Sequence, residues 1–190
     1  DNAVSIGVTC GKVGGYPKLD PYLPPPAIPK RSGAKPKLLF TATYDSSGMS
    51  GIGRWIDHLH ELTDRYEIAV SVHPWTNPEY IQRLRAMQGI SFIEDNPLHH
   101  IPDADVCIVD TSSIIAEICA LDKPMISWKI PAARRSVPEV YDIIAGISIQ
   151  IESFEELAGA LDLALAKPAA LAQERQQANK VFFDKLDGKA

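Results

Sequence analysis

Uninterrupted apolar runs alternate with stretches of helical periodicity from Lys37 to the end of the chain. The apolar runs predict strands at residues 38–43, 68–72, 90–93, 106–109, 124–128 and 147–151. The periodic stretches predict helices at residues 52–66, 78–87, 113–121, 154–167 and 168–186. Strands that are apolar throughout and alternate with helices form a parallel sheet that helices cover on both faces. We therefore expect the α/β class, with a Rossmann-like doubly wound parallel sheet of about six strands.

Residues 1–36 differ in character from this alternating part. Residues 4–8 predict one short strand, which the glycines between positions 11 and 15 interrupt. Prolines at positions 21, 24, 25, 26 and 29 favour a stiff, extended connector, because proline fixes φ and lacks a donor. We expect two parts: residues 1–36 as a connector with a short strand and a proline-rich arm, and residues 37–190 as the Rossmann-like domain. Because the first residue is Asp1 rather than Met, we expect a piece of a longer protein.

Composition argues against several classes of protein. The 190 residues are 45% hydrophobic and 23% charged, as in ordinary globular proteins. The net charge of -5 argues against a nucleic-acid-binding surface over the whole domain. No apolar stretch approaches the roughly 18 residues that span a bilayer, and no signal-peptide pattern opens the chain. Three cysteines without Cys-x-x-Cys spacing indicate a reducing compartment and no zinc site, so we expect a cytoplasmic location.

In doubly wound sheets, ligands bind beyond the carboxyl ends of the strands, near the point where strand order reverses. The strand expected at residues 106–109 ends in Asp110, and Thr111, Ser112 and Ser113 lead from it into a helix. Unpaired backbone N–H groups at a helix N-terminus favour a phosphate, which predicts an anion site here. The alternative is that one serine only caps the helix.

The other loops that follow strands supply further candidates. Three glycines, Gly48, Gly51 and Gly53, would let backbone amides approach a phosphate, or would simply make a flexible turn. His73, held by the following proline, would bind a phosphate oxygen or shuttle a proton, unless it is a surface histidine. One helical turn after the serines, Glu117 could accept hydrogen bonds from ribose or glycerol hydroxyls. Arginines that could reach phosphate oxygens follow the fifth strand at Arg134 and Arg135.

Four segments occur in an order that resembles the CDP-glycerol glycerophosphotransferase family, whose members build the poly(glycerol phosphate) chains of teichoic acids. The segments are Gly15-Tyr-Pro-Lys-Leu-Asp20, His73-Pro74, Asp110-Thr-Ser-Ser113 with Glu117, and Leu121-Asp-Lys-Pro-Met-Ile126. Their order and spacing agree with the family over residues 15–165. The resemblance implies the GT-B architecture of two Rossmann-like halves. Residues 37–190 would be the nucleotide-donor-binding half, and the acceptor-binding half would lie upstream.

The resemblance also implies an activity in cell-wall polymer synthesis. CDP-glycerol, or a related CDP-alcohol, would bind to His73, Ser112, Ser113 and Glu117, and an acceptor hydroxyl would attack the donor phosphate. His73 would be the catalytic group, either as proton shuttle or as phosphate ligand. No metal or other cofactor is expected, so activity should survive chelators. The piece alone would bind nucleotide without turnover, and contact with the inner face of the membrane would be peripheral, through a lipid-linked acceptor.

Other functions remain open on the sequence. The same scaffold suits a GT-B glycosyltransferase or an epimerase that uses a UDP-sugar. A non-enzymatic alternative is a ligand-sensing or receiver-like module, although a receiver needs an acidic cluster after the first strand and only Asp45 stands there. A third alternative is a stand-alone domain that has lost its catalytic partner.

Overall fold

A computed structural model describes residues 15–25, 33–130 and 138–189. Its strands form one sheet, in which every pair of neighbours is parallel. They are β1 (Lys37–Ala42), β2 (Glu67–Val72), β3 (Ile90–Phe92), β4 (Val106–Val109), β5 (Met125–Trp128) and β6 (Ile149–Ile151). The order β3-β2-β1-β4-β5-β6 is the Rossmann order and differs from the flavodoxin-like order of receiver modules. The expected α/β class and six-stranded parallel sheet are confirmed.

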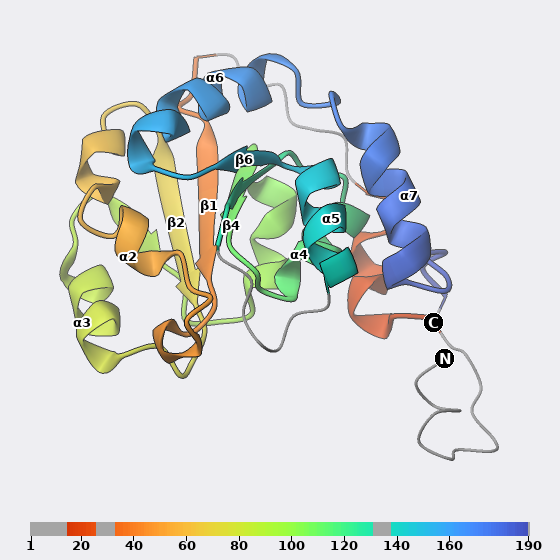
Figure 1. The fold of residues 1–190 in the computed structure, drawn as a ribbon, viewed down its shortest axis with the longest axis horizontal. Helices are drawn as coiled ribbons and strands as arrows, with labels where there is room; N and C mark the ends of the chain where they lie inside the picture. The colour runs from red at the N-terminus through yellow and green to blue at the C-terminus, as the bar shows by residue number, and fades with distance from the viewer. Residues whose placement is uncertain (1–14, 26–32, 131–137, 190) are drawn as a thin grey trace.

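Helices connect the strands and cover both faces of the sheet. The α-helices are α2 (Ile52–Trp55), α3 (Pro78–Ala86), α4 (Ile114–Ala120), α5 (Pro138–Ile147), α6 (Leu157–Ala166) and α7 (Ala172–Phe182). The 3-10 helices are η1 (Pro17–Tyr22), η2 (Asp45–Ser47), η3 (Leu59–Leu62), η4 (Pro97–His99), η5 (Ile101–Asp103) and η6 (Phe154–Glu156). Figure 1 shows α2 and α3 on one side of the sheet and α4, α5 and α7 on the other.

Two apolar clusters, one on each face, hold these layers together. Because successive side chains of a strand point to opposite faces, Leu38 and Phe40 join one cluster and Leu39 joins the other. The first cluster packs under α2, η3, α3 and α6, with Trp55 against Phe40 at a ring-centroid distance of 5.4 Å. The second packs under η1, α4, α5 and α7 and contains Ile118. Strand order reverses between β1 and β4, so the ligand crevice is expected there.

Three expectations about individual elements are wrong. The helix predicted at 52–66 is divided into α2 and η3, although its apolar face, Trp55 and Leu59 included, is buried as the periodicity indicated. Gly53 has low helix propensity, and the turn at His58 closes with a tight bond to the Trp55 carbonyl. Helix α5 was not predicted, and β6 begins at Ile149 because Ile147 ends that helix.

The connector is only partly extended in the residues that the structure describes: Leu23 is extended, and a 3-10 helix precedes it. Residues Pro17–Tyr22 form η1, and Leu19 is buried in the second apolar cluster. The strand predicted at residues 4–8 lies outside the described residues. At the other end, α7 packs on α4, and the buried Arg175 donates from Nε to Oδ1 of Asp122 at 2.6 Å. Both ends of the described chain therefore pack on the α4 side of the sheet (Figure 1).

Candidate functional site: a cavity at the carboxyl edge of the sheet

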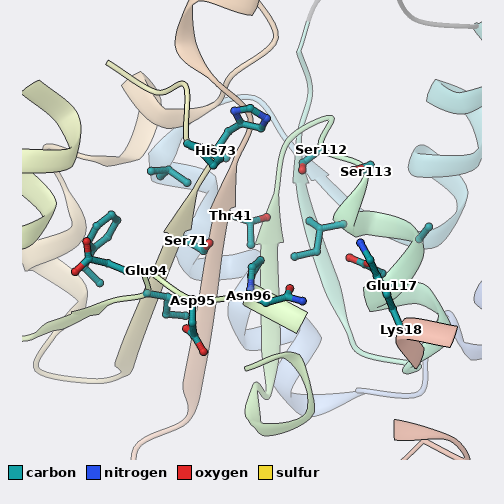
Figure 2. Close-up of a pocket in the computed structure, with 18 of the residues that line it drawn as sticks. Lys18, Thr41, Ser71, His73, Glu94, Asp95, Asn96, Ser112, Ser113 and Glu117 are labelled. Atoms are coloured by element: carbon teal, nitrogen blue, oxygen red, sulfur yellow. The ribbon is translucent and has the colours of Figure 1, made fainter. Parts of the chain in front are cut away.

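A cavity of about 710 Å³ opens where β1, β2 and β4 end, on the face of the sheet that α4 covers. Figure 2 shows side chains from β1, from β2, from the loop after β4 and from α4 around it. Four of the sequence-predicted residues line it: His73, Ser112, Ser113 and Glu117. The cavity is large enough for a nucleotide-sized ligand. The structure thus brings together the residues to which the family resemblance assigned donor contacts.

Both serines line the cavity, and the Ser113 hydroxyl does not cap the helix. Ser113 is the N-cap residue of α4, but its side chain makes no capping hydrogen bond. Ser112 donates its backbone N–H to Oδ1 of Asp110 at 3.0 Å, and both serines line the cavity. The capping alternative for Ser113 is therefore not what the structure shows. Because α4 has only seven residues, a role in phosphate binding rests on the two hydroxyls more than on a helix dipole.

Asp110 ties two loops together and does not line the cavity. Its side chain is 1% exposed, and Oδ2 accepts from the N–H groups of Thr43 at 2.9 Å and Gly51 at 3.1 Å. Burial raises the pKa of Asp110 above its ordinary value of 3.8, and the bonds from backbone N–H groups act against this rise. The carboxylate joins the loop after β1 to the loop after β4, and so holds these two loops together where the strand order reverses.

The glycine loop packs beneath the site. The amide of Gly51 is engaged by Asp110, and a Cβ there would lie 2.8 Å from Cδ1 of Trp128. Gly48 has a φ of 71° and ends η2 in the left-handed region. Thr111 donates its hydroxyl to the Met49 carbonyl at 3.3 Å. Gly48, Gly51 and Thr111 lie outside the cavity lining, and phosphate contact by any of them stays a prediction. Arg134 and Arg135 fall outside the described residues.

His73 stands at one end of the cavity (Figure 2), and its contacts define its orientation. Its Nδ1 accepts the backbone N–H of Trp75 at 3.1 Å, and its ring lies 5.1 Å from that of Tyr44 and 5.2 Å from that of Trp75. An imidazole that accepts a hydrogen bond at Nδ1 carries its proton at Nε2 when it is neutral. The loop therefore presents Nε2–H as a hydrogen-bond donor.

Glu117 is held by a residue of the connector. The Tyr16 hydroxyl donates to Oε1 of Glu117 at 2.8 Å, and Lys18 lines the same wall of the cavity. Sequence reasoning assigned no role to either connector residue, although the Gly-Tyr-Pro segment carried part of the family resemblance. It also missed Thr41 and Ser71, which form the cavity floor (Figure 2). The signal for these two was a hydroxyl residue near the carboxyl end of an otherwise apolar strand.

In the part of the chain that the structure describes, no group of three or more His, Cys, Asp or Glu side chains is placed to hold a metal ion. Within the same residues, no helix combines the length and the apolar character needed to cross a membrane. Cys107 and Cys119 are buried free thiols.

Comparison with solved structures identifies the architecture. The UDP-GlcNAc 2-epimerase of Methanocaldococcus jannaschii, in complex with UDP-GlcNAc and UDP, is 17% identical with a TM-score of 0.55, over 95% of this chain and 57% of the epimerase. The chain folds as one half of a GT-B protein. ADP-heptose LPS heptosyltransferase II of E. coli gives 12% identity and a TM-score of 0.56, over 74% of this chain and 50% of that one. Anabaena HepE, in complex with UDP-glucose, is 12% identical with a TM-score of 0.55, over 77% of this chain and 43% of HepE.

The chain thus spans about half the length of these neighbours, which include glycosyltransferases. No protein-family model matches the chain, and no curated protein matches it either. The GT-B expectation is confirmed for the fold. The narrower resemblance to the CDP-glycerol glycerophosphotransferases stays a prediction.

Proposed function

We propose that this domain binds the nucleotide-diphosphate part of an activated donor in the carboxyl-edge cavity, as the donor half of a GT-B transferase. The observation that carries the proposal is the convergence of Ser112, Ser113, His73 and Glu117 on one cavity at the switch point of the sheet. The two serine hydroxyls and the Nε2–H of His73 are donors suited to phosphate oxygens. Glu117 is an acceptor suited to a ligand hydroxyl.

In the proposed reaction, these hydrogen-bond donors would contact the phosphate oxygens of the leaving group. In glycerophosphate transfer, an acceptor oxygen attacks the donor phosphorus, the phosphoanhydride bond breaks and CMP departs. In glycosyl transfer, the acceptor attacks the sugar carbon and the nucleoside diphosphate departs. Negative charge builds on the departing phosphate in both reactions. Hydrogen-bond donors already aimed at those oxygens would stabilise the transition state.

Two donor classes are candidates for this cavity. The four ordered segments that resemble CDP-glycerol glycerophosphotransferases favour a CDP-alcohol, with cell-wall polymer synthesis as the role. The structural neighbours that are complexes with UDP, UDP-GlcNAc or UDP-glucose favour a UDP-sugar and a glycosyltransferase or epimerase reaction. In either case the acceptor would be bound by a second domain, so the domain alone should bind nucleotide without turnover.

Calorimetric titration with CDP, CDP-glycerol, UDP and UDP-GlcNAc tests the proposal. Cytidine-selective binding would favour the CDP-alcohol class, and uridine-selective binding the UDP-sugar class. The variant Ser112→Ala/Ser113→Ala should weaken binding of the preferred nucleotide by roughly tenfold or more, because hydrogen bonds to charged groups are the strong ones. Ser46→Ala changes an exposed serine of η2 that does not line the cavity; it is the matched control and should bind as the wild type does. Equal affinity in the double variant and the wild type would contradict the proposal.

A further inference from the structure

Two hydroxyl side chains occupy strand positions where an apolar residue is the usual choice. Thr41 of β1 and Ser71 of β2 are register partners, and they are 4% and 7% exposed. They follow Leu39 and Ala69 on the same face of the sheet, because side chains alternate along a strand. Their neighbouring positions place both hydroxyl residues on the floor of the cavity (Figure 2).

The hydroxyl of Thr41 has no hydrogen-bond partner within the described part of the chain. A buried hydroxyl without a partner destabilises a fold, so such groups in native proteins are usually satisfied by water or by a ligand. Thr76 also carries a buried, unpartnered hydroxyl, but it does not line this cavity. Thr41 is distinguished by facing the space in which the proposed donor would lie.

The charges around the cavity indicate which part of a nucleotide meets this floor. Figure 2 shows His73 and Ser112 toward one end of the cavity and Asp95 toward the other, with the floor between them. Glu94 and Asp95 both line the second end, and Arg85, which also lines the cavity, pairs with Glu94. A diphosphate placed there would face two carboxylates, and the guanidinium beside them is already paired. The uncharged nucleoside half suits that end, and the diphosphate suits the end at His73 and Ser112.

The side chains beside the floor suit a flat heterocycle. Ile93 and Ile114 give the cavity apolar walls. Asn96 uses Oδ1 to accept the backbone N–H of Leu98 at 3.0 Å, which leaves its amide N–H groups as donors at the rim. Apolar walls with a few polar groups at defined positions are typical of sites for planar ligands.

We propose that Thr41 and Ser71 form the floor of a nucleobase subsite, in which their hydroxyls hydrogen-bond the polar edge of the base of the bound nucleoside diphosphate. The inference rests on the proposed function. It goes further by assigning the base to the floor and the diphosphate to the end of the cavity at His73 and Ser112. It also gives a role to the two hydroxyl residues that lie between apolar residues in these strands.

The test compares two ligands that differ only in the base: CDP, or UDP if the wild type prefers it, and ribose 5-diphosphate. Affinities are measured by calorimetry for the wild type, Thr41→Val and Ser71→Ala. Thr41→Val preserves the shape of the side chain and removes a buried hydroxyl, so we expect the variant to fold at least as stably as the wild type. Each variant should bind the nucleotide about fivefold more weakly and leave ribose 5-diphosphate binding unchanged. Thr76→Val removes an unpartnered hydroxyl outside the cavity and should change neither affinity.

The remaining outcomes overturn the inference in distinguishable ways. Unchanged nucleotide affinity in both variants would mean that only water meets the two hydroxyls. Equal weakening of both ligands would place the contacts on the ribose or the phosphates instead of the base. Wild-type protein that binds neither ligand would refute the proposed function itself, and the subsite with it.

Discussion

The hydroxyl of Tyr16 donates a 2.8 Å hydrogen bond to Oε1 of Glu117, across 101 positions of sequence. Burial, followed by the bond to Glu117, raises the pKa of Tyr16 to about 12, so the phenol stays a donor throughout the ordinary pH range. Its ring also meets that of Phe183 edge-on, at 5.3 Å between centroids. The connector therefore orients the carboxylate through Oε1, and the contact with a ligand hydroxyl that we propose for Glu117 would use Oε2.

Tyr16→Phe should lower the affinity for the preferred nucleotide several-fold and weaken its discrimination against the 2′,3′-dideoxy analogue, with little change in thermal stability. The ring and its contact with Phe183 are kept, whereas the bond that orients Glu117 is lost. Calorimetry with the two nucleotides measures the effect. Tyr22→Phe removes the hydroxyl that bonds His99 outside the cavity and serves as the control. Unaltered discrimination in Tyr16→Phe would show that this hydrogen bond only anchors the connector.

The role of His73 can be separated by two substitutions. If Nε2–H donates to a phosphate oxygen, His73→Gln should retain most of the nucleotide affinity, because an amide N–H can occupy a similar place. His73→Ala should reduce affinity about tenfold, as expected for a lost hydrogen bond to a charged group. Calorimetric titration of both variants gives the comparison. Equal losses in the two variants would argue against the donor role.

Gly51→Ala should lower the free energy of unfolding by about 1–3 kcal/mol, the usual range for added volume in a packed core. The new Cβ would lie 2.8 Å from Cδ1 of the buried Trp128. Gly53→Ala is the matched control, because a Cβ there meets only the Tyr80 hydroxyl at 4.0 Å. That change should be neutral or stabilise by up to about 1 kcal/mol. Urea unfolding of both variants decides the matter, and an undisturbed Gly51→Ala protein would contradict the packing argument.

Asp110 should make stability fall as pH rises. Its pKa is raised in the folded state by burial, so the folded state binds more protons than the unfolded state between the unfolded and folded pKa values. The contribution is complete below the unfolded pKa and is lost as pH rises through the folded pKa. Urea unfolding at pH 4 and pH 7 should therefore show the wild type losing stability relative to Asp110→Asn. A difference between the two proteins that does not vary with pH would refute this assignment.

The strands could be predicted from the sequence because each depends on a run of a few consecutive apolar residues. Runs such as the one that begins at Leu38 identified the strands to within two residues at either end. The helix expected at 52–66 had the right buried residues but the wrong continuity, since periodicity does not distinguish an α-helix from successive short turns. The missed α5 did carry a signal: Pro138 at its start, and Val140, Ile143, Ile144 and Ile147 at helical spacing.

The candidate site was predictable where residues follow strand ends or lie in the first turn of the next helix. His73 and the two serines were identified because carboxyl ends of parallel strands share one edge of the sheet. Thr41 and Ser71 were missed because each lies inside a strand, where a hydroxyl residue near the carboxyl end is the one sign of the cavity above it. Phosphate contact by the Gly51 amide stays a prediction, and the structure adds a second reason for a glycine there, because a Cβ would lie 2.8 Å from Cδ1 of Trp128.

The sequence by itself determined the class of fold and four of the polar residues that line the cavity, because both depend on patterns a few residues long. The tertiary structure alone decided which of these residues meet. Strand order places β1 beside β4, so that Asp110 can bind the backbone of Thr43 and Gly51. Packing of the connector against α4 brings Tyr16 to Glu117. Such contacts join segments that are distant in the chain, and their geometry depends on how both sides pack, which no local pattern encodes.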